Sequence, residues 1–261
     1  MSEAVKVERA GAVAILRLND PSAMNALSPP VKAGLQANVP PLLADAAVRA
    51  IVLTGTGKAF CAGGDIRAMT NPEGRKAPAV RTRMQAAHAW ARALLDCDKP
   101  VIAAVNGAAV GWGMELALMA DFRIVSERAR FGELFVRRGL VSDPVGLGRL
   151  AQLVGREKAT ELLMTGDVID ADEARRIGLV GRVVPHEELL NEAGALARRI
   201  AANPPLAVRA IKQGLRRALD PDWASLGRWV SETLDALFQT EDHREGVRAF
   251  LEKREPRFTG R

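Results

Sequence analysis

A buried strand that runs into a glycine-rich turn and then into a helix constrains this fold most. Residues 101–121 read VIAAVNGAAVGWGMELALMAD. The apolar, partly β-branched start favours a buried strand, and Gly107, Gly111 and Gly113 predict the turn. We expect the helix to run from about residue 113 to residue 120. Its first N–H groups have no partner within the helix, so this turn is suited to hold an anion or a developing oxyanion.

A second glycine-rich loop precedes this unit. A short apolar strand is expected at residues 50–53, and the loop at 54–65 contains four glycines. Within it, residues 59–66 read AFCAGGDI, where Gly63 and Gly64 would let a backbone N–H approach a ligand closely. A lone loop of this kind is most simply a tight turn. Two such loops, each following a strand, could direct two N–H donors at one carbonyl oxygen.

The order of the expected elements indicates an α/β fold. Strands are expected at 12–18, 50–53 and 101–105, with helices from Ser28 to about residue 46 and over 81–95, and a loop at 71–78. After about residue 155 helices dominate, at 157–164, 171–177, 187–202, 206–218, 223–238 and 243–253. The break at Asn203-Pro204-Pro205 divides the chain into a core, residues 1–202, and a helical C-terminal region, residues 203–261.

The overall charge narrows the classes of partner. The formal net charge is +6, but the 37 Lys and Arg residues are dispersed rather than gathered in a run. A phosphate-bearing small molecule accounts for this excess, and nucleic acid is the less favoured partner. The two cysteines predict a reduced, cytoplasmic protein with no disulfide framework. No Cys/His spacing suggests a metal, and no apolar stretch is long enough to span a membrane.

Glu115 is the first candidate for chemistry. It lies in the first or second turn of the expected helix, among apolar neighbours. On its position alone, an acidic residue that stabilises a helix start is the simpler interpretation. The alternative is a general acid or base beside an oxyanion site.

The two loops together resemble a known family. AFCAGGDI, followed by KPVIAAVNGAAVGWGMELALMADFRI, resembles the two signature segments of the enoyl-CoA hydratase/isomerase (crotonase) family, and the likeness continues through FGELFVRRGLVSD, NPPLAVRAIK and FLEKR. The resemblance implies a spiral of ββα units with a helical C-terminal trimerisation region. It also implies an acyl-CoA thioester substrate, no separate cofactor, and a homotrimer or homohexamer.

The resemblance also implies roles for single residues. The backbone N–H groups of Gly64 and Trp112 would stabilise a thioester enolate, although the family usually has glycine at the position of Trp112. Glu115 matches a catalytic glutamate. Phe135 stands where hydratases carry their second glutamate, and Glu133 is near but out of register. Asp143 matches a catalytic aspartate of some isomerases, and a turn residue before proline is the less favoured alternative.

Coenzyme A contacts are expected from several segments. Met24 and Ala26 match the family's early CoA-side segment, while Ala62, Gly64 and Ile66 match the stretch beside the adenine. Arg67 would lie near the phosphates, and Phe135 would shape the acyl pocket. Phe250 and Lys253 match a C-terminal pair that reaches the CoA of a neighbouring subunit. Without the family context, packing or solvated charge is the simpler interpretation of each.

These expectations favour one activity over two others. An enoyl-CoA hydratase is the first choice. In such an enzyme, water adds across a double bond while one carboxyl group acts as base and another as acid. The alternative is an enoyl-CoA isomerase that uses Glu115 and Asp143, which the phenylalanine at position 135 favours. A third possibility of another class is an RNA-binding homologue, and the dispersed charge argues against it.

Overall fold

The main sheet has six strands. The computed structural model describes residues 3–66, 89–203, 205–219 and 222–256. The strands are Val5–Ala10 (β1), Val13–Leu18 (β2), Ala50–Gly55 (β3), Val101–Val105 (β5), Phe122–Ser126 (β7) and Arg182–Val184 (β10), in the order β1-β2-β3-β5-β7-β10. Only the β1–β2 pair is antiparallel.

A smaller sheet carries the site. It consists of Ala59–Cys61 (β4), Ala108–Val110 (β6), Arg130–Gly132 (β8) and Ile169–Asp170 (β9), with β4, β6 and β8 parallel. In three successive units, one strand joins the large sheet, the next joins the small sheet, and a helix follows. These helices are Ala89–Asp96 (α4), Trp112–Leu118 (α5) and Pro144–Val154 (α6). The expected spiral of ββα units is thereby confirmed.

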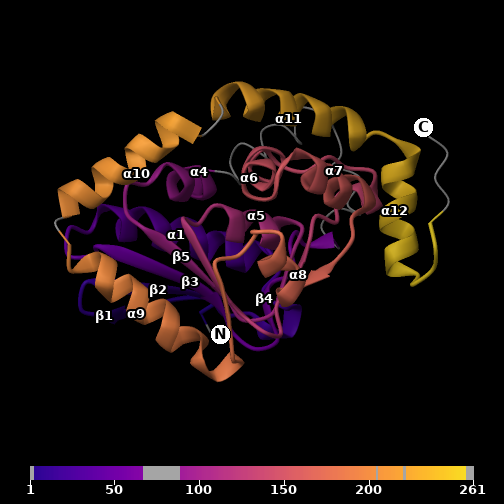
Figure 1. Ribbon diagram of the computed structural model, residues 1–261. Helices are drawn as coiled ribbons and strands as arrows, with labels where there is room; N and C mark the ends of the chain where they lie inside the picture. The colour runs from indigo at the N-terminus through magenta and orange to yellow at the C-terminus, as the bar shows by residue number, and fades with distance from the viewer. Residues whose placement is uncertain (1–2, 67–88, 204, 220–221, 257–261) are drawn as a thin grey trace.

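The central strands of the main sheet are buried on both faces. In β3, Ile51 and Leu53 belong to the cluster that includes the buried side of Pro29–Ala44 (α1), while Ala50 and Val52 face Leu189–Ala201 (α9). Because side chains alternate along a strand, a strand covered on both sides needs a continuous apolar run. Figure 1 shows α9 crossing one face of this sheet.

Three C-terminal helices surround the core. Pro205–Leu219 (α10), Trp223–Leu237 (α11) and Glu241–Leu251 (α12) follow one another along the outside of the molecule (Figure 1). Among the core elements, α11 packs on α6, and α12 packs on the short helix Val136–Arg138 (η3). The division into core and oligomerisation region stays a prediction. In the part of the chain that the structure describes, no helix has the length and apolarity to cross a membrane.

The remaining elements connect these layers. They are Pro21–Ala23 (η1), Arg156–Thr165 (α7), Ala171–Arg176 (α8) and His186–Glu188 (η4). The expected loop at 54–65 contains strand β4, and the helix expected to start at residue 113 begins one residue earlier. Helix α6 was not anticipated. The expected loop at 71–78 lies outside the described residues, and the helix expected at 81–95 is described only from Ala89.

Candidate active site

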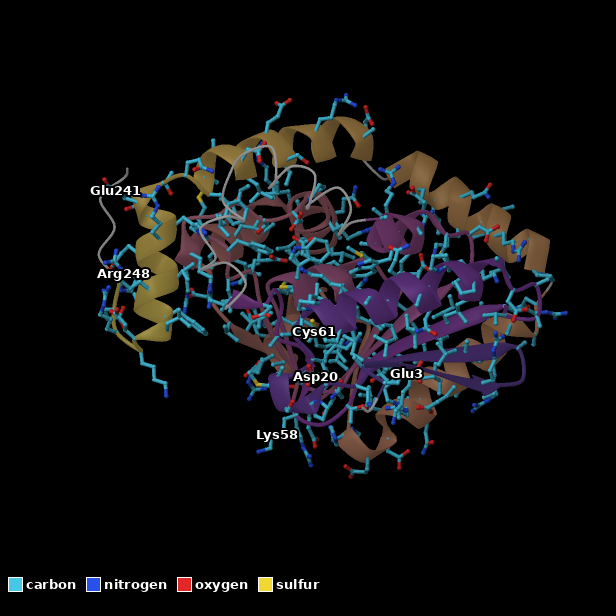
Figure 2. The ribbon with its side chains drawn as sticks, turned by 180° about the vertical axis from the view of Figure 1, so that it is seen from behind. Glu3, Asp20, Lys58, Cys61, Glu241 and Arg248 are labelled. Atoms are coloured by element: carbon cyan, nitrogen blue, oxygen red, sulfur yellow. The ribbon has the colours of Figure 1, made fainter. Side chains whose placement is uncertain are left out.

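The two glycine-rich loops are held against each other by backbone contacts. A Cβ on Gly113 would lie 1.9 Å from the carbonyl oxygen of Cys61, and one on Gly107 would lie 2.0 Å from that of Lys58. No real side chain tolerates such distances, so only glycine permits this approach. The backbone of the β6–α5 turn is therefore in direct contact with that of β4. Figure 2 places Cys61 near the middle of the molecule.

Two buried asparagines fix the first loop. The Asn106 side chain accepts a hydrogen bond from the Gly55 N–H at 3.1 Å and donates one to the Gly57 carbonyl at 2.9 Å. The amide of Asn25, which is fully buried, donates to the Ala59 carbonyl at 2.8 Å. Because these bonds satisfy buried backbone groups, they hold the loop in one conformation.

The expected oxyanion donors lie on adjoining segments. Gly63 has φ +91°, a conformation that favours glycine, and a Cβ on it would lie 3.3 Å from the backbone nitrogen of Trp112. Gly64 follows directly, and Trp112 is the first residue of α5. The structure therefore brings the two predicted donor segments together. Their role as donors stays a prediction.

Glu115 is fully buried and tied to the start of α6. Its Oε2 accepts a hydrogen bond of 2.7 Å from the backbone N–H of Gly146, and the backbone of Asp143 supplies another. Burial raises the pKa of Glu115 well above its usual value, and the nearby carboxyls of Glu133 and Asp143 raise it further. These surroundings therefore favour its protonated form over its charged form.

Asp143 is the second buried carboxyl. It occupies the N-cap position of α6 and is 2% exposed. Burial raises the pKa of Asp143 to about 7, although a hydrogen bond from the Trp112 side chain opposes this rise. A group with such a pKa can accept or release a proton near neutral pH.

A cavity of about 530 Å³ opens beside Asp143. Asp143, Trp112, Val145 and Met119 contribute to its wall, together with residues of α4 and α11. The described residues that line the cavity do not include Glu115 or Glu133. Of the three carboxyl residues of this cluster, Asp143 is therefore the one that borders the cavity, although both of its carboxyl oxygens are buried.

Trp112 finds room at the same wall. Its ring centroid lies 6.3 Å from that of the buried Trp90, with the rings tilted by 53°. Because Trp112 also lines the cavity, its indole occupies space that a glycine would leave open.

Glu133 is a site residue that the sequence interpretation set aside. It follows β8, is fully buried, and accepts a hydrogen bond of 3.3 Å on Oε2 from the Ser142 hydroxyl. Burial raises the pKa of Glu133 to about 8. A charged residue at the carboxyl end of a small-sheet strand was the available signal. Within the described residues, no group of His, Cys, Asp or Glu is arranged to hold a metal.

Phe135, two residues after Glu133, packs away from the carboxyl cluster. Its side chain packs against an apolar cluster that includes Leu140 and, from α11, Val230 and Leu234. It is absent from the described lining of the cavity beside Asp143. The contact of Phe135 with an acyl chain therefore stays a prediction.

The expected CoA-side segments form two separate groups. The Ala62 N–H donates to the Met24 carbonyl at 3.0 Å, and the Leu27 N–H donates to that of Gly63 at 2.8 Å. This pairing brings Met24 and Ala26 alongside the first loop, which continues to Ile66. Arg67 lies outside the described residues.

The C-terminal pair lies at the end of α12, away from that loop. Figure 2 shows this helix, marked by Glu241 and Arg248, at the edge of the molecule. The Phe250 ring is half exposed and lies 4.6 Å from the Arg138 guanidinium, and Lys253, just beyond the helix, is exposed. The contact of Phe250 and Lys253 with the CoA of a neighbouring subunit stays a prediction.

Comparison with known proteins adds an independent observation. Residues 8–261 match the family model described as enoyl-CoA hydratase/isomerase. The chain belongs to the enoyl-CoA hydratase/isomerase family. The expected family and fold are thereby confirmed.

Several relatives cover the chain almost completely. It is 41% identical to a crotonyl-CoA hydratase of Syntrophomonas wolfei, over 98% of both chains. It is 40% identical to a short-chain-enoyl-CoA hydratase of Clostridium acetobutylicum, over 96% of this chain and 95% of the relative. A solved carnitinyl-CoA hydratase from Mycobacterium avium is 36% identical, with a TM-score of 0.84 over all of both chains.

Proposed function

We propose that this enzyme adds water to the double bond of a 2-enoyl-CoA thioester. The observation that carries the proposal is the pair of buried carboxyls at the start of α6, where the backbone of that helix binds Glu115 and Asp143 borders the cavity. Similarity to proteins named as hydratases of CoA thioesters supports the same reaction.

The proposed chemistry divides between the two carboxyls. Asp143 takes a proton from water while the water oxygen bonds to C3 of the substrate, and the electrons of the double bond move toward the thioester oxygen. The N–H groups of Gly64 and Trp112 stabilise the enolate that results. Glu115 then gives its proton to C2. Transfer of the proton from Asp143 to Glu115 restores both groups, so atoms and charges balance over one turnover.

The difference in pKa supports this assignment. Burial raises the pKa of Asp143 to about 7, whereas the pKa of Glu115 is raised by burial and, in addition, by two neighbouring carboxyls. Two carboxyls with separated pKa values are suited to act as base and acid at one pH.

Substrate binding is proposed from the remaining predicted residues. Met24, Ala26, Ala62 and Ile66 would lie along the coenzyme, because hydrogen bonds already join their two segments. Arg67 would approach the phosphates. Phe250 and Lys253 would act on the coenzyme bound to a neighbouring subunit, which their exposure on α12 permits.

Phe135 favours a second candidate function. A phenylalanine packed against α11 leaves this position without a carboxyl. An isomerase moves a double bond by shifting a proton between carbons, and Asp143 with Glu115 supplies enough groups for that transfer. The same cavity and the same predicted oxyanion donors would serve both reactions.

Product analysis distinguishes the two candidates. The protein is incubated with CoA thioesters whose double bond starts at C2 or at C3, and the products are separated and identified by mass. Hydration predicts a 3-hydroxyacyl-CoA from the 2-enoyl substrate. Recovery of 2-enoyl-CoA from the 3-enoyl substrate, with no hydrated product from either, would instead establish the isomerase.

A further inference from the structure

Glu133 faces the proposed catalytic pair without lining the cavity. It emerges from the end of β8 and has no exposed surface. Its Oε2 accepts the hydrogen bond from Ser142, the residue before Asp143. It is therefore attached to the same chain segment that presents Asp143 to the cavity. The proposed mechanism so far gives this buried carboxyl no task.

The free oxygens of Glu133 and Glu115 lie against one glycine. A Cβ on Gly146 would lie 2.5 Å from Oε1 of Glu115 and 3.0 Å from Oε1 of Glu133. The Oε2 atoms already accept hydrogen bonds, from Gly146 N–H and from Ser142. Both Oε1 atoms are buried and have no hydrogen-bond partner among the described residues. Two buried carboxylates at the same glycine, with no donor to these oxygens, repel each other, and a proton held by the pair relieves that repulsion.

Among the residues that the structure describes, the ionisable groups that face Glu133 are carboxyls. They are Glu115 on α5 and Asp143 on α6. The other charged side chains of the packed elements have different contacts or are exposed. Arg138 lies over the Phe250 ring, Arg137 pairs with Asp167, Glu173 pairs with Arg176 and Lys158, Arg149 lines a separate cavity with Arg123, and Arg130 and Asp170 are exposed.

We propose that Glu133 shares one proton with Glu115, Oε1 to Oε1, and thereby keeps Glu115 protonated for transfer to the substrate. This inference rests on the proposed function. Glu133 is a positioning residue, since it acts through Glu115 and does not touch the substrate. When Glu115 gives its proton to C2, both Glu115 and Glu133 are left as carboxylates, and their mutual repulsion favours the return of a proton to Glu115. The proton that Asp143 took from water then returns to Glu115, and Glu133 ends the cycle as it began.

The proposal predicts a shift in pH dependence. Glu133→Gln preserves shape and removes the second ionising carboxyl, so the pKa of Glu115 falls. The alkaline limb of the kcat/KM profile, which reports loss of the acid, should move to lower pH by about one unit. KM should stay within about threefold at the optimum, because Glu133 makes no substrate contact. Glu133→Asp should restore part of the wild-type profile.

The matched control is Glu127→Gln. Glu127 is exposed in the turn between β7 and β8, so the same loss of charge occurs away from the cluster. This variant should keep the wild-type profile. A Glu133→Gln enzyme with lower kcat but unmoved limbs would show a merely structural role and overturn the proposal. An unchanged rate and profile would overturn it equally.

A readout without substrate separates this inference from the proposed function. With carbon-13 in the glutamate carboxyls, a nuclear magnetic resonance titration should show Glu115 and Glu133 titrating as a coupled pair. In Glu133→Gln, the midpoint of Glu115 should move to lower pH. Independent titration of the two carboxyls refutes the shared proton. Coupled titration in a protein that hydrates no enoyl-CoA refutes the function alone.

Discussion

At the scale of single residues, the site depends on Glu115 and Asp143. Glu115→Gln should lower turnover by at least about 100-fold, because the amide cannot give up a proton as an acid does. Asp143→Asn should cause a similar loss. The double variant should be little worse than either, since groups that act as a unit are not additive. Steady-state kinetics of the three variants tests this, with circular dichroism to confirm folding.

The kinetics of the Glu115→Gln and Asp143→Asn variants also distinguish hydration from isomerisation. If Asp143→Asn is silent while Glu115→Gln is inactive, Glu115 works alone, and a double-bond isomerase becomes the better account. Near-normal turnover of Glu115→Gln removes Glu115 from the mechanism.

Trp112 allows a second test on one residue. Trp112→Phe keeps a ring in the cavity wall and removes the hydrogen bond that lowers the pKa of Asp143. The pKa of Asp143 should then rise, which moves the acidic limb of the kcat/KM profile to higher pH by about one unit. Trp90→Phe is the control, because Trp90 touches the Trp112 ring but has no bond to Asp143. Equal profiles for all three proteins would contradict the role of the indole.

The sequence indicated Glu115 and Asp143 but not Glu133. Counting positions from Glu115 reached Phe135, which made Glu133 look out of register. The chain instead turns at Phe135, whose backbone is helical, and that side chain packs toward α11. A count along the sequence cannot foresee such a turn, because it depends on the cluster that α11 supplies.

At the scale of elements, the site depends on how closely α6 approaches the two glutamates. Gly146→Ala would place a methyl group against Oε1 of both Glu115 and Glu133. The start of α6 would have to move, which should cost about 1–3 kcal/mol of unfolding free energy and sharply reduce activity. Thermal unfolding and kinetics measure both effects.

The control for this variant lies on an outer helix. Gly214 in α10 has open space where a Cβ would stand, so Gly214→Ala should be neutral or stabilise the helix by up to about 1 kcal/mol. If Gly146→Ala proved as harmless as this control, the close packing of α6 on the carboxyls would be refuted.

Long periodic elements were predictable, and short non-local ones were not. Strand β5 and helices α9 and α10 carry clear apolar patterns of their own, and they lie within one or two residues of the expected positions. Strands β4, β6 and β8 have only three residues each. Their strand character comes from pairing with one another, which local pattern does not report.

At the scale of the whole molecule, three buried carboxyls link stability to pH. Because burial raises the folded-state pKa values of Asp143 and Glu133 to about 7 and 8, the folded chain binds more protons than the unfolded chain above about pH 4. Their contribution to the free energy of unfolding should therefore fall as pH rises from about 4 to about 8. Thermal unfolding across this range measures the slope.

Glu133→Gln should flatten that slope and raise the melting temperature at pH 8, since one buried carboxyl no longer needs to ionise. Glu127→Gln, which changes an exposed carboxyl, should keep the wild-type slope. A slope equally steep in Glu133→Gln and wild type would contradict the raised pKa of Glu133.

Assembly is a second property of the whole molecule. On α10, Ile211 is 63% exposed and Leu215, one turn later, is 56% exposed. We expect a trimer or a dimer of trimers, in which such apolar side chains become covered. Light scattering should show that assembly, and Ile211→Asp should weaken it, while Gln213→Asp on the same helix should have less effect. A stable wild-type monomer at micromolar concentration would contradict it and remove Phe250 and Lys253 from the coenzyme site.

The most direct test of the account follows the oxygen of water. The wild-type protein is incubated with a short 2-enoyl-CoA in water labelled with heavy oxygen, and the product is examined by mass spectrometry. The account predicts a 3-hydroxyacyl-CoA that carries the label on C3, with formation at least about 100-fold slower in Glu115→Gln. A substrate recovered unchanged, or converted only to a positional isomer without label, would contradict hydration by this site.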